Sequence, residues 1–431
     1  MSTTTTEAVP TVDHKPHAVF FRQSGWLMIA AIVSGFLTFG VHFLAKSKSV
    51  DESQYAAFGT LLMVVACLPT IPLQMIFTQQ TALKLATGQE RQLAGLIRLA
   101  WLWTFVVWLL LAAVVFIFQK QIISGWHLPG AATLWVTLLL LLFSLWMPMF
   151  SGVLQGRQDF FWLGWSTIFG GVGRIAGAAF LVLALTMGAT GMMAGAVFGV
   201  GLVAAVTIWR SRDLWLGTAE PFDGKTLMRQ VTPLIFGFGA CQFMFTSDTM
   251  FAKAYFSDDQ MAPYVAAGTL SRALLWLVLP LATVMFPKIV HANARAEKSN
   301  LFGIVVLGTA ALAIIGGLGL WIVGPIVIKL AYNSNYLGAA KLIPWYAAAM
   351  VPLALANVTM NDLLARARFA VVPWMLLLAV AYGFTLPAML NHFPGKIEVV
   401  LQTLAAFNLL LFLICAWFTW GVKDRPPKPE A

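Results

Sequence analysis

Long apolar segments follow one another along almost the whole chain, and only short polar loops separate them. A helix needs roughly 20 mostly apolar residues to cross a bilayer. Of the 431 residues, 60% are hydrophobic and 10% are charged, whereas a soluble chain has about 25% charged residues. Such a chain cannot cover a water-facing surface, so we expect an all-α integral membrane protein. The sequence predicts twelve transmembrane helices, over residues 25–45, 56–78, 99–119, 131–154, 160–186, 189–209, 231–253, 263–287, 302–330, 340–361, 370–390 and 399–421.

The two halves of the chain resemble each other at a fixed offset of 209 residues. Segment 55–61 (YAAFGTL) returns as segment 264–270 (YVAAGTL). Four further positions match at the same offset: Leu154, Arg157, Phe160 and Trp165 with Leu363, Arg366, Phe369 and Trp374. An offset of six spans brings the chain back to the same side of the membrane, so the repeats are parallel. We therefore expect two parallel six-helix lobes around a central cavity, an architecture typical of carriers.

These spans divide the chain into five predicted parts. The two lobes cover residues 25–209 and 231–421, a cytoplasmic linker covers 210–230, and cytoplasmic tails cover 1–24 and 422–431. Basic residues favour the cytoplasmic side of a membrane. With the N-terminus in the cytoplasm, most of the 27 Lys and Arg residues fall on that side, so we expect both termini to be cytoplasmic.

Four charged residues fall inside predicted spans. Arg174 lies about halfway along the fifth span and Arg272 about ten residues into the eighth, while Asp248 and Lys253 lie in the outer part of the seventh. A charge at such depth costs about 3 kcal/mol or more on insertion scales, so each one needs a reason. One interpretation is a cationic lining for an anionic substrate, with Asp248 setting the Arg272 geometry or taking a coupling ion. The other is a buried Arg272–Asp248 pair that fixes helix packing.

Other patterns indicate packing and no chemical site. Gly191, Gly195 and Gly199 recur at helical spacing, which is typical of closely packed membrane helices. His127, His291 and His392 lie in predicted loops without companion ligands, which argues against a metal site. The net charge of +10 is spread over the loops and forms no single patch, which argues against a nucleic-acid partner. We predict no catalytic residue, no metal and no cofactor.

Several segments resemble the polysaccharide-biosynthesis (oligosaccharide-lipid) flippases. Residues 152–160 (GVLQGRQDF), which lead into the span with Arg174, are similar to the region between spans four and five of that family. Residues 264–288, with AAGTLSR, LP and FPK, are similar to its span eight. The resemblance implies membership of the multidrug, oligosaccharidyl-lipid and polysaccharide exporter superfamily. Its fold has twelve spans in two six-helix lobes around a cavity.

The same resemblance implies a substrate and its binding residues. The position of Arg272 is similar to a cavity arginine of the lipid II flippases, where a cation faces the substrate pyrophosphate. The arginine that those proteins carry early in span one is missing, and Arg22 lies just before that span instead. This difference favours another lipid-linked glycan over lipid II.

The predicted function is a flippase that moves undecaprenyl-pyrophosphate-linked oligosaccharide across the bacterial cytoplasmic (inner) membrane by alternating access. Arg272, Arg174 and Lys253 would bind the substrate. The expected partners are the lipid-linked glycan, membrane lipids and polysaccharide polymerase machinery. Two alternatives stay open. A cation-coupled multidrug exporter of the same fold would need an acidic cavity, and an integral-membrane glycan-processing enzyme would need a clustered acid–base or metal site.

Overall fold

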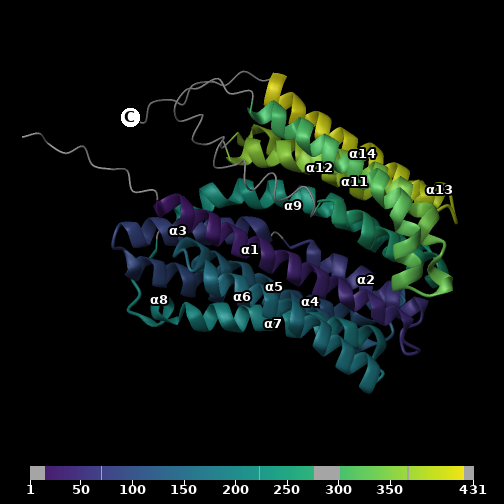
Figure 1. Cartoon of the computed structure of the whole chain (residues 1–431), viewed down its shortest axis with the longest axis horizontal. Helices are drawn as coiled ribbons and strands as arrows, with labels where there is room; N and C mark the ends of the chain where they lie inside the picture. The colour runs from purple at the N-terminus through teal and green to yellow at the C-terminus, as the bar shows by residue number, and fades with distance from the viewer. Residues whose placement is uncertain (1–14, 69, 223, 276–300, 366–367, 422–431) are drawn as a thin grey trace, which may run out of the picture.

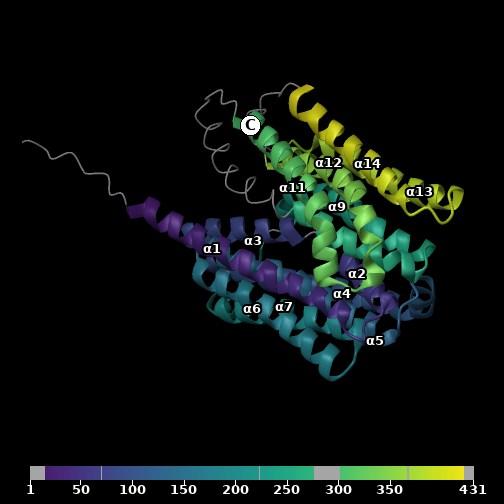
Figure 2. The ribbon, with the colours of Figure 1, turned by 45° about the vertical axis from the view of Figure 1, so that its right-hand side comes forward.

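The computed structural model describes residues 15–68, 70–222, 224–275, 301–365 and 368–421. These residues contain helices and no strand. The helices form two groups that lie side by side along their length, with α1 to α8 in the first lobe and α9 to α14 in the second (Figure 1). Figure 2 shows from a second side that α2 and α9 lie where the lobes meet.

The first lobe is built from seven longer α-helices and three short helical segments. In chain order its elements are α1 (Lys15–Gly40), η1 (Val41–Lys46), α2 (Glu52–Ala66), α3 (Thr70–Ala86), α4 (Glu90–Gly125), α5 (Ala131–Gly156), α6 (Phe160–Ala179), η2 (Phe180–Ala184), α7 (Gly188–Arg210) and α8 (Arg212–Leu216).

The second lobe repeats this pattern with long helices joined by short turns. Its elements are α9 (Gly224–Tyr255), a helix that includes residues 258–275, α11 (Leu301–Ala331), η3 (Ser334–Tyr336), α12 (Ala339–Ala365), η4 (Phe369–Val371), α13 (Val372–His392), α14 (Glu398–Ala416) and η5 (Trp417–Gly421).

Ten of the twelve predicted spans coincide with helices of the described residues that are long and apolar enough to cross a membrane. The seventh predicted span, 231–253, lies within α9, which carries several polar side chains and is not among the ten. The eighth predicted span, 263–287, begins in the helix at 258–275. Its remainder lies outside the described residues.

The second predicted span, 56–78, is not one continuous helix. The α-helix α2 ends at Ala66, and α3 begins at Thr70. Turn hydrogen bonds join Leu68 N to Val65 O and Thr70 N to Leu68 O. Pro72 follows in the first turn of α3, where a proline costs no intrahelical hydrogen bond. Hydropathy alone cannot detect this break because both helices are apolar.

Close packing of α6 and α7 confirms the interpretation of the glycine stripe. A Cβ atom on Gly195 would lie 2.7 Å from the Arg174 carbonyl oxygen, and one on Gly199 would lie 2.6 Å from the Gly170 carbonyl oxygen. Both distances are below van der Waals contact. Glycine therefore lets the two helix backbones approach each other at these positions.

The segment after α7 folds onto the first lobe. Arg98 of α4 donates hydrogen bonds to the carbonyl oxygens of Trp215 at 2.7 Å and Gly217 at 2.6 Å. The Glu220 amide donates to the Arg91 carbonyl oxygen at 3.0 Å. The predicted linker 210–230 is therefore anchored to α4 along its first half and includes the short helix α8.

Candidate functional site

Asp248 is the centre of a buried polar cluster in the second lobe. It lies on α9 and has 0% exposed surface. Its two carboxylate oxygens accept hydrogen bonds from Arg272 Nη2 at 2.7 and 2.8 Å. The hydroxyls of Tyr264 and Tyr346 donate to Oδ2 at 2.6 and 3.0 Å. The carboxylate is therefore stabilised by three side chains that come from two other helices.

Arg272 lies on the helix at 258–275 and is 4% exposed. Besides Asp248, its guanidinium donates to Thr249 Oγ1 at 2.9 Å and to the Phe245 carbonyl oxygen at 3.3 Å. The same group lies over the rings of Phe245 and Tyr346, 5.6 and 5.4 Å from their centroids. Cation–π contacts of this kind stabilise a desolvated cation. In this arrangement the charge of Arg272 is matched by Asp248.

Lys253 lies near the end of α9 and is also completely buried. Its amine forms an ion pair with Asp258, whose side chain is 32% exposed. Asp258 begins the next helix, so the pair bridges the turn between α9 and the helix at 258–275. The structure thus places Lys253 one and a half turns along α9 from Asp248, with a carboxylate partner of its own.

Arg174 lies in the first lobe, on the face of α6 that packs against α7. Its Nε atom is buried and has no hydrogen-bond partner among the described residues. Among the described residues, no hydrogen bond or ion pair joins Arg174 to the Asp248 cluster, so the two predicted arginines occupy different lobes.

The lobes are joined at the end of the bundle away from the start of α1, by a set of contacts that we name the latch. His42 Nδ1 and the Tyr55 hydroxyl lie 2.8 Å apart, and the Tyr55 hydroxyl lies 2.8 Å from that of Tyr332. His42 and Tyr55 belong to the first lobe, and Tyr332 follows α11 in the second. All three side chains are buried. The latch therefore closes this end of the interface with a buried hydrogen-bonded chain.

Three further contacts belong to the latch and cross between the lobes. The Lys46 amine donates to the Leu330 carbonyl oxygen, the Asn333 amide donates to the Ala45 carbonyl oxygen, and the Asn335 amide donates to the Glu52 carboxylate.

The repeated segments meet at the interface between the lobes. Gly59 of the first repeat packs so closely on Val265 of the second that a Cβ atom on Gly59 would overlap the valine side chain. The equivalent tyrosines have related roles. The Tyr55 hydroxyl is hydrogen-bonded to Tyr332 in the latch, and the Tyr264 hydroxyl donates a hydrogen bond to Asp248. Sequence reasoning used the repeat to define the lobes but missed these two tyrosines, although their equivalence at the repeat offset was a signal that could have found them.

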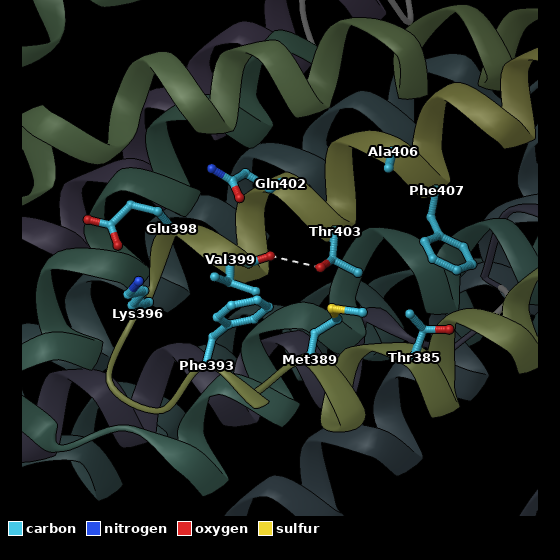
Figure 3. Close-up of a pocket in the computed structure, with 10 residues that line it drawn as sticks. All are labelled: Thr385, Met389, Phe393, Lys396, Glu398, Val399, Gln402, Thr403, Ala406 and Phe407. Carbon is cyan, nitrogen blue, oxygen red and sulfur yellow. Dashed lines mark hydrogen bonds between the residues drawn. The ribbon is translucent and has the colours of Figure 1, made fainter. Parts of the chain in front are cut away.

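Two cavities of similar size lie in the second lobe, away from the predicted site residues. One of about 540 Å³ lies between α13 and α14 (Figure 3), and one of about 530 Å³ lies between α9 and α13. Within the described part of the chain, no group of three or more His, Cys, Asp or Glu side chains is arranged to hold a metal ion.

The two-lobed helical arrangement defines the class of fold. Solved structures of transporters from the MOP superfamily share it over nearly their whole length. No protein-family profile matches the chain, and no curated protein matches it in sequence. The structural likeness therefore shows the fold.

Three of these structures illustrate the likeness. A multidrug resistance MATE family transporter in an inward-facing conformation has a TM-score of 0.72 and 10% identity, covering 90% of this chain and 93% of that one. The lipid II flippase MurJ in an inward closed conformation has a TM-score of 0.69 and 13% identity, covering 93% and 88%. A MOP superfamily transporter from Pyrococcus furiosus, described as having a binding pocket of reverse polarity, has a TM-score of 0.62 and 12% identity, covering 93% and 94%.

Proposed function

We propose that this protein is a flippase that carries undecaprenyl-pyrophosphate-linked oligosaccharide across the bacterial cytoplasmic membrane by alternating access. The pyrophosphate would bind to Arg272, with Arg174 and Lys253 adding positive charge. The glycan would occupy the space between the lobes, and the prenyl chain would remain in the lipid. No covalent step is part of this proposal.

The observation that carries the proposal is the buried guanidinium of Arg272 in a protein with a two-lobed carrier fold. Arginine binds carboxylate and phosphate oxygens through two parallel N–H groups. In the closed arrangement both Asp248 carboxylate oxygens accept from one nitrogen of this group, Arg272 Nη2. We infer that a phosphate group of the substrate replaces the Asp248 carboxylate during transport.

This exchange explains why both charges are present. A lone buried arginine would be strongly destabilising, because an unpaired charge in a low-dielectric interior loses its hydration without compensation. Asp248 supplies that compensation when the substrate is absent. After the exchange, the hydroxyls of Tyr264 and Tyr346 would still donate to the Asp248 carboxylate. Neither charge is then left without a partner in either state.

The latch supports the alternating-access part of the proposal. All of its contacts lie at one end of the lobe interface, and α1 begins towards the other end (Figure 1). Two of the structurally similar transporters are described as inward-facing or inward closed. Transport would require the latch to open, which exposes the substrate to the other side of the membrane.

The test is a flipping assay with the purified protein in vesicles that contain a fluorescent prenyl-pyrophosphate-linked oligosaccharide. A membrane-impermeant quencher reports the leaflet in which the glycan lies. The variant Arg272→Met/Asp248→Asn removes both charges together. The control Arg157→Met/Asp213→Asn removes an exposed ion pair of similar geometry.

Wild type and the control should flip the glycan at similar rates. The variant without the buried pair should be at least about tenfold slower, because a hydrogen bond to a charged group contributes about 1.5–3 kcal/mol and 1.4 kcal/mol is a factor of ten. Normal flipping by this variant, or by Arg272→Ala, would mean that the pair serves helix packing alone.

A second candidate function, a cation-coupled multidrug exporter, is favoured by one observation. Asp248 is a completely buried carboxylate in the second lobe, and such a group is able to take a coupling cation. In that case vesicles with a proton or sodium gradient would accumulate a cationic dye, and Asp248→Asn would abolish the accumulation. The flippase proposal predicts no dye transport by wild type.

A further inference from the structure

The cavity between α13 and α14 is a groove with a charged end and a mostly apolar remainder, in which Thr385 and Thr403 also lie. Lys396 and Glu398 lie where the chain turns from α13 into α14, and Gln402 lies one turn further along (Figure 3). Met389 and Phe407 line the part that runs between the helices. From Glu398 to Phe407 the groove follows α14 for about 13 Å, at 1.5 Å per residue.

The turn that carries Lys396 is held in a defined shape. The Gly395 backbone has φ +78°, a left-handed conformation that residues with a Cβ atom rarely adopt. Its carbonyl oxygen accepts a hydrogen bond from Gln260, at the start of the helix that carries Arg272. Ile397 is buried against the core. The charged end of the groove is therefore fixed in position and does not depend on a free loop.

The two charges at this end have no ionic partner in the described structure. No ion pair within the described ranges involves Lys396 or Glu398. Among the described residues, Lys396 makes one cation–π contact, with the Phe393 ring, whose centroid lies 5.8 Å from the amine. Figure 3 shows both side chains at the same end of the groove. This end therefore presents one positive and one negative group next to each other.

We propose that the groove binds one phospholipid whose headgroup carries both a phosphate and a primary ammonium group, as in phosphatidylethanolamine. The phosphate would contact Lys396, and the ammonium would contact Glu398. One acyl chain would lie along Met389, Ala406 and Phe407. This site is separate from the Asp248 cluster and does not depend on the transport substrate.

The charges distinguish this headgroup from other common lipids. A phosphatidylglycerol headgroup would satisfy Lys396 but would leave Glu398 next to an added negative charge. A phosphatidylcholine headgroup has the right charges, but its quaternary ammonium cannot donate a hydrogen bond to a carboxylate. The expected order of affinity is therefore phosphatidylethanolamine, then phosphatidylcholine, then phosphatidylglycerol.

The test is native mass spectrometry of the full-length protein, released from micelles doped with one of these three lipids. Wild type should retain one phosphatidylethanolamine in a saturable manner. Lys396→Met and Glu398→Gln should each weaken this binding about 1.5-fold to fivefold, the range expected for an exposed ion pair. Glu398→Gln should also remove the preference for phosphatidylethanolamine over phosphatidylglycerol.

Three further variants make the result specific to the groove. Ala406→Trp fills the apolar part and should abolish retention, with helix content by circular dichroism showing that the protein is folded. The exchange Lys396→Glu/Glu398→Lys keeps both charges and should restore most of the binding lost in the single variants. Lys120→Met removes an exposed lysine on α4 and should have no effect. Equal retention of the three lipids by wild type, or undiminished retention by Ala406→Trp, would overturn the proposal.

Discussion

Removing one partner of the Arg272–Asp248 pair should destabilise the protein far more than removing both. Arg272→Met leaves a carboxylate with 0% exposure, and its remaining donors within the described ranges are hydroxyls. Breaking a buried pair in this way costs about 3–5 kcal/mol. Replacing both charged groups by neutral ones of similar size is often close to neutral. In Arg272→Met/Asp248→Asn, the asparagine oxygen still accepts from Tyr264 and Tyr346. The double-mutant cycle should therefore give a coupling free energy of at least about 3 kcal/mol, the cost of one single variant.

The chain contains a matched control for this measurement. Arg157 Nη1 donates to both carboxylate oxygens of Asp213 at 2.8 and 2.9 Å, a geometry as short as that of the buried pair. The control side chains, however, are 26% and 56% exposed. Exposed ion pairs contribute about 0.2–1 kcal/mol. The cycle with Arg157→Met and Asp213→Asn should therefore give a coupling below about 1 kcal/mol.

Both cycles can be measured by equilibrium unfolding in mixed micelles with increasing dodecyl sulfate, followed by tryptophan fluorescence. The chain has 17 Trp residues, so the signal is large. Equal coupling in the two cycles would refute the reasoning, because burial is the main difference between the pairs. An Arg272→Met variant as stable as wild type would refute it as well.

Three other predictions follow from single contacts. In an unfolding assay, Gly195→Ala should destabilise the first lobe by more than about 2 kcal/mol, because the added Cβ atom would overlap backbone atoms of α6. The control Gly239→Ala should be neutral or stabilising, because a Cβ atom there has no neighbouring atom within 4 Å. Tyr332→Phe removes a buried hydrogen bond worth about 1 kcal/mol and should increase the open-latch population about fivefold, seen as a longer inter-lobe distance between spin labels. Asp258→Asn frees Lys253 and should raise the apparent affinity for the glycan in the flipping assay, and an unchanged affinity would contradict a substrate role for Lys253.

The sequence predicts the helices well because membrane insertion depends mainly on local composition. Ten predicted spans appear as apolar helices. The exceptions have physical causes. The break between α2 and α3 falls inside an apolar run, where hydropathy does not change. Helix α9 is less apolar because residues such as Thr246 and Asp248 face other parts of the protein and not lipid. For example, the Thr246 hydroxyl lies 2.7 Å from the sulfur of Cys67, at the end of α2.

The candidate site could be predicted only in part. Its charges stand out because a buried charge is rare in a membrane span, and the pairing of Asp248 with Arg272 was one of two interpretations. The tyrosines do not stand out, since Tyr264 and Tyr346 are ordinary residues for an apolar helix. Their hydroxyls acquire a role only when three helices bring them to one carboxylate. The partner of Lys253 was likewise hidden, because Asp258 lies beyond the end of the span.

The most direct test of alternating access is to lock the latch reversibly. Glu52 and Asn335, which are hydrogen-bonded across the lobes, are both replaced by cysteine in a chain whose native Cys67, Cys241 and Cys415 are serine. The reduced protein should flip the lipid-linked glycan, oxidation to the disulfide should stop flipping, and added reductant should restore it. Continued flipping by the fully cross-linked protein would contradict the account, because the lobes could then not separate at this end.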